Sequence, residues 1–149
     1  AGMMGADAGE QIVGSPPYMS PEQCSMKDAD PRSDFYSLAI VIFEALSGKL
    51  PYQARSAMEI IECHISGQPK VLKDLGTNTA TYESVSAVIA RAMEKRPDKR
   101  YPNAAAFSEE LEDAFNKDSK RGLALKHRAD LESAGGKGVA NLSKEVRVE

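Results

Sequence analysis

The side chains best suited to metal binding or nucleophilic chemistry are few and far apart in this sequence. Cys24 and Cys63 form no C-x-x-C pair and belong to no cluster with histidine, which predicts neither a zinc site nor a disulfide framework and favours a reducing, cytoplasmic location. His64 has no acid or second base at a matching spacing, so we interpret it as helix surface or packing. The glycines at 135–138 lack the G-x-x-x-x-G-K-S/T spacing of a phosphate loop. We therefore predict no catalytic residue and no metal ligand in this chain.

The strongest predicted helix spans Asp34–Ser47. Its apolar residues lie on both of its sides: Leu38, Val41, Ile42, Ala45 and Leu46 on one, Ile40 and Phe43 on the other. A helix that is apolar nearly all round is surrounded by protein, so we expect it to be the hub of the domain. Asp34 stands at its start, where a carboxylate gains about 0.3–1 kcal/mol from the helix dipole. Gly48 is the expected left-handed cap at its end.

Three further helices are predicted. Ser56 and Glu59 have the spacing of a capping box, which begins a helix near 57–66 with Met58, Ile61 and Ile65 on one face. Apolar periodicity favours another helix from about Thr81 to Glu94. Asn103 is a plausible N-cap for the last one. No segment shows the sustained alternation of a strand, so the predicted fold class is mainly α.

The chain changes character near residue 116. Residues 1–115 carry 11 Lys or Arg against 17 Asp or Glu, whereas residues 116–149 carry 8 against 5. Because helical patterning also weakens there, 116–149 is predicted to be a charged linker or partly disordered tail. The formal net charge of −3 shows no overall attraction to nucleic acid. The longest apolar run, Leu38–Phe43, is too short to cross a bilayer.

Four short motifs occur in order along residues 1–115. They are G-S-P-P-Y-M-S-P-E-Q at Gly14–Gln23, S-D-F-Y-S-L at Ser33–Leu38, L-S-G-K-L-P-Y at Leu46–Tyr52 and P-D-K-R-Y at Pro97–Tyr101. They resemble the end of the activation segment, the two ends of the central helix and the segment before the last helix of protein kinases. The chain is identified on this resemblance as a bacterial-type serine/threonine kinase fragment that starts within the activation segment.

The resemblance implies a fold and a division of the chain. The expected fold is the helical C-terminal lobe of the protein kinase-like fold, without the N-terminal β lobe. Residues 1–22 are then the end of the activation segment with the substrate-side loop, and residues 23–115 are the helical lobe. The remaining 116–149 is the tail.

Three charged residues acquire structural roles from the resemblance. Glu22 and Arg100 would form an ion pair in the lobe interior, a role that suits the planar guanidinium; the alternative is two ordinary surface charges. Asp34 would anchor the catalytic loop by accepting hydrogen bonds from its backbone, a role compatible with that of a plain N-terminal helix carboxylate.

The resemblance also assigns a substrate-binding group. Ser15 stands where the family has a threonine whose hydroxyl bridges to catalytic groups, although it could equally be a turn hydroxyl. Pro17 and Tyr18 would line the pocket for the substrate residue after the phosphoacceptor. Residues 1–14 contain no Ser, Thr or Tyr, so activation by phosphorylating this stretch is closed unless the site lies upstream or is Ser15.

The chain contains neither H-R-D-x-x-x-x-N nor D-F-G, which kinases need for phosphoryl transfer. ATP and Mg are thus implied only for an intact parent, and we expect this chain to bind neither and to be inactive alone. Its expected partners are protein substrates and the missing N-lobe and catalytic loop of the same kinase. Two alternatives remain: a non-catalytic interaction module that reuses the lobe, and an unrelated helical domain such as a DNA-binding one, which would lack a basic recognition helix. A membrane anchor of the parent beyond Glu149 is left open.

Overall fold

The computed structural model describes residues 14–72 and 82–145, with side chains as far as Glu132. All regular structure in these ranges is helical, which confirms the predicted class. The elements in chain order are the 3-10 turn η1 (Pro16–Tyr18), α1 (Pro21–Cys24), α2 (Pro31–Ser47), α3 (Ala57–Ser66), α4 (Glu83–Ala92), the 3-10 turn η3 (Pro97–Lys99) and α5 (Ala104–Glu145).

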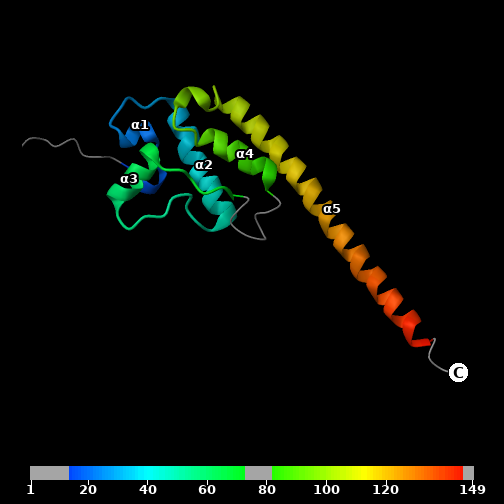
Figure 1. Ribbon diagram of the computed structural model, residues 1–149. Helices are drawn as coiled ribbons and strands as arrows, with labels where there is room; N and C mark the ends of the chain where they lie inside the picture. Colours follow the sequence, from blue (N-terminus) through cyan, green and yellow to red (C-terminus); the bar gives the residue numbers. More distant parts are fainter. Residues whose placement is uncertain (1–13, 73–81, 146–149) are drawn as a thin grey trace, which may run out of the picture.

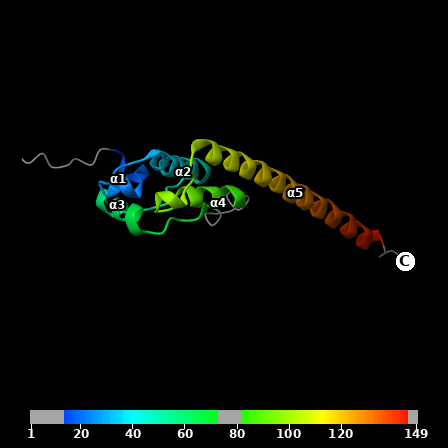
Figure 2. The ribbon, with the colours of Figure 1, turned by 90° about the horizontal axis from the view of Figure 1, so that it is seen from above.

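The first four helices form a small lobe, and α5 extends from it (Figures 1 and 2). Helix α2 runs through the lobe, with α1 and α3 at one end. Helix α4 packs against the first part of α5 and also against α2. The core lies between these elements and includes Phe35, Tyr36, Ala39, Ile40, Phe43, Val85, Val88, Ile89, Tyr101 and Phe107.

Helix α2 begins earlier than predicted. Asp30 is its N-cap and forms a capping box with Ser33, and Pro31 occupies the first helical position, where proline costs no hydrogen bond. Asp34 consequently lies in the first turn rather than at the start, and its side chain is exposed. At the other end Gly48 adopts φ 68°, as expected of a left-handed cap.

The expectation that α2 is surrounded by protein is wrong for the described residues. Its buried side carries Phe35, Tyr36, Ala39, Ile40 and Phe43, whereas Leu38 and Val41 remain 46% and 47% exposed. Helix α4 and the turn η1 both contact α2, yet Leu38 and Val41 are left without enough neighbours among the described residues to be buried.

Helix α3 has the predicted bounds, but a different face of it is buried. Ser56 caps it by accepting a hydrogen bond from the Glu59 amide. The buried positions are Ile60, Ile61 and His64, while Met58 and Ile65 are 63% and 43% exposed. The buried face of α3 is therefore rotated relative to the face predicted from apolarity, because His64 rather than Ile65 points inward.

Helix α5 does not end near residue 115 but continues to Glu145. Asp118 lies in the predicted tail, yet it is only 3% exposed, and its carboxylate accepts hydrogen bonds from the backbone amides of Ser84 (3.1 Å) and Val85 (2.9 Å). It supplies the cap that Tyr82, the N-cap residue of α4, does not provide. Packing thus reaches Asp118. Apolar periodicity could not reveal this, because the buried group is a carboxylate.

Candidate functional site

Glu22 and Arg100 meet inside the lobe. Arg100 Nη1 lies 2.7 Å from Glu22 Oε1, and Nη2 lies 2.8 Å from Oε2, so the two side chains form a bidentate pair. The Arg100 side chain is 0% exposed and that of Glu22 is 8% exposed. Glu22 is carried by the short helix α1, and Arg100 follows the turn η3, so the pair joins the chain after the substrate-side loop to the segment before α5.

The charges of this pair have further partners. Arg100 donates from Nε to the carbonyl of Glu94 (2.7 Å), from Nη1 to that of Arg32 (3.1 Å) and from Nη2 to that of Lys95 (3.1 Å). Ser33 Oγ donates to Glu22 Oε1 at 2.6 Å. Burial acts to raise the pKa of Glu22, but the hydrogen bonds from Arg100 and Ser33 outweigh it and lower the pKa to about 2. A buried pair satisfied in this way is costly to break from one side.

The substrate-side loop, residues Ser15–Tyr18, is fastened to α2 through Tyr18. The Tyr18 hydroxyl donates to Glu44 Oε2 at 2.6 Å, and its carbonyl accepts from Ser37 Oγ at 2.6 Å. The Tyr18 amide donates to the Ser15 carbonyl at 3.0 Å, closing the turn. Ser15 itself is exposed and its side chain makes no cap hydrogen bond, so its hydroxyl is free of the turn.

Pro17 and Tyr18 have different neighbours among the described residues, and their joint role in substrate binding stays a prediction. Pro17 lies at a hollow of about 300 Å³ between the loop and the start of α3, with Pro16, Ala54, Arg55, Ser56, Ala57 and Ile60. Tyr18 instead turns toward Glu44 on α2. The two residues predicted to act together therefore contact different elements.

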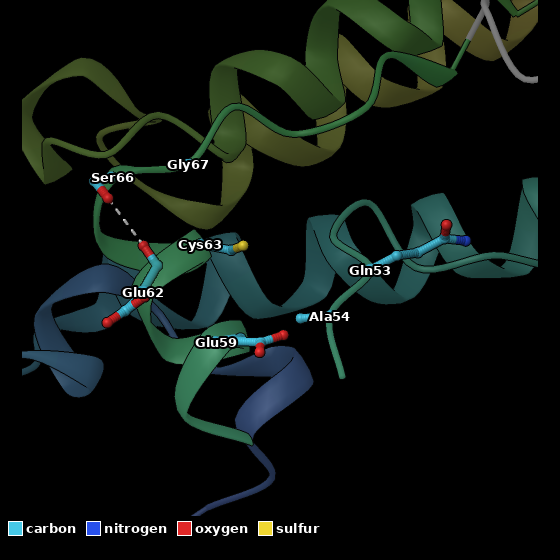
Figure 3. Close-up of a pocket in the computed structure, with 7 residues that line it drawn as sticks. All are labelled: Gln53, Ala54, Glu59, Glu62, Cys63, Ser66 and Gly67. Carbon is cyan, nitrogen blue, oxygen red and sulfur yellow. Dashed lines mark hydrogen bonds between the residues drawn. The ribbon is translucent and has the colours of Figure 1, made fainter. Parts of the chain in front are cut away.

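A second hollow, of about 330 Å³, lies over α3 (Figure 3). It is lined by Gln53, Ala54, Glu59, Glu62, Cys63, Ser66 and Gly67. Ala54 belongs to both hollows, so they adjoin. The second is acidic through Glu59 and Glu62, and Glu59 is partly engaged because its carboxylate accepts from the Arg55 amide at 2.7 Å. The loop is thus bordered by an apolar hollow followed by an acidic one.

Asp34 points to solvent in the first turn of α2. No H-R-D sequence occurs in the chain, so its role as an anchor of the catalytic loop stays a prediction. In residues 14–72 and 82–145, no three His, Cys, Asp or Glu side chains gather where they could hold a metal ion. None of the described helices combines the length and apolarity needed to cross a membrane.

His64 is the residue that sequence reasoning left without a role. It is completely buried and forms a polar cluster with Tyr36, Tyr52 and Lys95. Its spacing four residues after buried Ile60 was the available signal, since positions i and i+4 share a helix face.

Comparisons with known proteins agree with the geometry. The model of the protein kinase domain matches residues 3–116. The serine/threonine-protein kinase PksC of Streptomyces coelicolor is 39% identical over 99 residues, which are 66% of this chain and 17% of PksC. The serine/threonine-protein kinase PrkC of Bacillus subtilis is 35% identical over 107 residues, 72% of this chain and 16% of PrkC.

A relative named as a tyrosine kinase also matches. The tyrosine-protein kinase MasK of Myxococcus xanthus is 31% identical over 101 residues, 68% of this chain and 15% of MasK. The chain thus spans less than a fifth of the length of these three relatives. With the family model covering most of the chain and the helical lobe in place, the chain belongs to the protein kinase domain family.

Proposed function

We propose that this chain is part of a serine/threonine protein kinase, which transfers the γ-phosphoryl group of Mg-ATP to protein hydroxyl groups. Within it, residues Ser15–Tyr18 dock the substrate and the Glu22–Arg100 pair supports the activation segment. The observation that carries the proposal is the bidentate, buried pair that fixes the chain directly after this loop. Because the chain directly after the loop is fixed, the loop presents a constant surface to a substrate. Catalysis by positioning requires such a surface.

We assign the binding of ATP and Mg to other parts of the proposed kinase. Phosphoryl transfer needs carboxylates that hold the metal and a lysine that holds the phosphates, and this sequence contains neither H-R-D-x-x-x-x-N nor D-F-G. No chemical step is therefore assigned to this chain. It binds and orients the substrate, and the reacting groups come from elsewhere in the intact, cytoplasmic kinase.

The experiment starts from the complete reading frame that contains this chain. The purified product is incubated with Mg-ATP and a mixture of substrate proteins, and the phosphorylated residues are identified after acid hydrolysis. We expect phosphoserine and phosphothreonine, with none when Mg is removed by a chelator. Detection of phosphotyrosine alone would contradict the proposed transfer to serine and threonine hydroxyl groups. A product that transfers no phosphate but captures proteins would instead favour a non-catalytic interaction module.

A further inference from the structure

A buried histidine lies in α3, the helix that contacts the substrate-side loop at η1. His64 is 0% exposed and belongs to α3, which packs against η1. Its ring meets Tyr52 edge-on, with centroids 4.9 Å apart, and Tyr36 with centroids 5.7 Å apart. Its Nδ1 lies 2.9 Å from the Tyr36 hydroxyl on α2. One ring nitrogen is thus tied to the central helix.

The other ring nitrogen has no hydrogen-bond partner. His64 Nε2 is buried, and no group of the described residues bonds to it. The carbonyls of Pro16 and Pro17, in the turn η1 that α3 contacts, oppose the lowering of the His64 pKa. A buried polar atom without a partner is costly, so a hydrogen bond from Nε2 to these carbonyls is favourable.

Pro16 and Pro17 leave this part of the loop without backbone hydrogen-bond donors. Proline has no backbone N–H and fixes φ, so Pro16 and Pro17 offer only carbonyl groups for hydrogen bonding. The Pro16 carbonyl accepts a long contact from the Met19 amide at 3.4 Å. A side-chain N–H from a neighbouring element complements such a turn, and His64 on α3, which contacts η1, carries a buried nitrogen that has no other partner.

The surroundings also decide the charge and tautomer of the ring. Burial, and next the positive charge of Lys95, lower the pKa of His64 to about 4, with the proline carbonyls opposing this. Lys95 Nζ is held close by, donating to the Tyr52 hydroxyl (2.6 Å) and to the carbonyls of Cys63 (2.9 Å) and His64 (2.8 Å). The ring is therefore neutral near pH 7. Since a carbonyl can only accept, the proton belongs on Nε2 and Nδ1 accepts from Tyr36.

We propose that His64 is the positioning residue of the substrate-side loop, donating from Nε2 to the carbonyls of Pro16 and Pro17 while Nδ1 accepts from Tyr36. It transmits the placement of α2 and α3 to the loop and touches no reacting atom. That the loop receives a substrate rests on the proposed function; the hydrogen bonds do not.

The first test measures the tautomer in the full 149-residue chain labelled with ¹⁵N-histidine. The Nε2 shift of His64 is expected at the position of a protonated nitrogen and the Nδ1 shift at that of an acceptor. A proton on Nδ1 would overturn the proposal, because Nε2 could then not donate to a carbonyl. This readout needs no variant, and His127, which is exposed, provides the internal reference.

The second test separates the two ring contacts. The side-chain nitrogen of His64→Gln reaches the place of Nε2, whereas that of His64→Asn reaches only the place of Nδ1; Tyr36→Phe removes only the hydroxyl. Amide hydrogen exchange is followed at Tyr18 and Met19, the turn amides. We expect His64→Asn to speed exchange about three- to tenfold, and His64→Gln and Tyr36→Phe to stay near wild type.

Equal acceleration in His64→Gln and His64→Asn, in step with their loss of thermal stability, would show that the ring only fills space. If neither variant folds, the tautomer measurement decides alone. Neither test involves phosphate transfer, so a failed phosphorylation assay leaves them unaffected, and a failed exchange test leaves the proposed kinase function standing.

Discussion

Charged residues are used in opposite ways in the interior of the lobe and on the later part of α5. Around Glu22 and Arg100 the charges are buried, bidentate and fully partnered. On the later part of α5 they lie on the surface, as in the Arg128–Glu132 pair, whose side chains are 79% and 69% exposed. The buried pair fixes distant segments relative to one another, whereas the exposed pair joins residues of a single helix. The same residue types should therefore differ greatly in what their removal costs.

The largest effect is expected from Arg100→Ala. It leaves the Glu22 carboxylate buried without its cation, which costs about 3–5 kcal/mol of unfolding free energy. Urea denaturation measures the loss. The matched control is Arg96→Ala, because the Arg96–Asp98 pair is 71% and 53% exposed and should cost at most about 1 kcal/mol. Similar losses in both variants would erase the contrast between the buried and exposed pairs.

Acid should lower the unfolding free energy of the chain through Glu22. Its pKa is lowered from 4.5 to about 2 in the folded chain, so its contribution is present above pH 4.5 and is lost as the pH falls toward 2. That difference corresponds to about 3 kcal/mol. Urea midpoints measured between pH 5 and 2 test it, with Glu22→Gln as the variant that should lack this slope. An equally steep decline in Glu22→Gln would contradict the assignment.

His64 gives a separate slope at higher pH. Its pKa is lowered from 6.5 to about 4, so the folded chain favours the neutral ring and loses stability as the pH falls from 6.5 to 4. The His64→Gln variant should be less stable at pH 7 but flatter in this window. Denaturation midpoints at pH 7, 5.5 and 4.5 distinguish this slope from that of Glu22, and an unchanged slope in the variant would count against a buried neutral ring.

A smaller loss is expected from Asp118→Ala, which removes the cap of α4. Losing a capping carboxylate costs about 0.5–2 kcal/mol. Asp130→Ala, at an exposed position of the same helix, is the control and should change stability by less than about 0.5 kcal/mol. Thermal unfolding compares the two. Equal midpoints would mean that the packed lobe ends before Asp118.

Sequence reasoning succeeded where the signal was local. Ser56 and Gly48 mark helix ends by chemistry that lies within a few residues, and both were placed correctly. It failed where burial depends on distant partners. Asp118 is buried because it caps a helix 33 residues away, a contact that leaves no periodic pattern. His64 shares a helix face with Ile60, but its hydrogen bond to Tyr36, 28 residues away, could not be read from that spacing.

The site itself could be approached only through resemblance. Glu22 and Arg100 are 78 residues apart, and nothing in their neighbourhoods pairs them. The motifs around them did suggest the pairing. The same resemblance grouped Pro17 with Tyr18 as substrate-binding residues, and that grouping stays a prediction. It gave no indication that the Tyr18 hydroxyl donates to Glu44.

The most direct measurement is a double-mutant cycle on Glu22→Ala and Arg100→Ala, with unfolding free energies from urea denaturation. If the pair holds the chain behind the substrate-side loop, the double variant should lose much less than the sum of the two single losses. The expected coupling free energy is about 2–3 kcal/mol. Single losses that add to within about 0.5 kcal/mol would show that the two residues act independently, and the support assigned to this pair would be wrong.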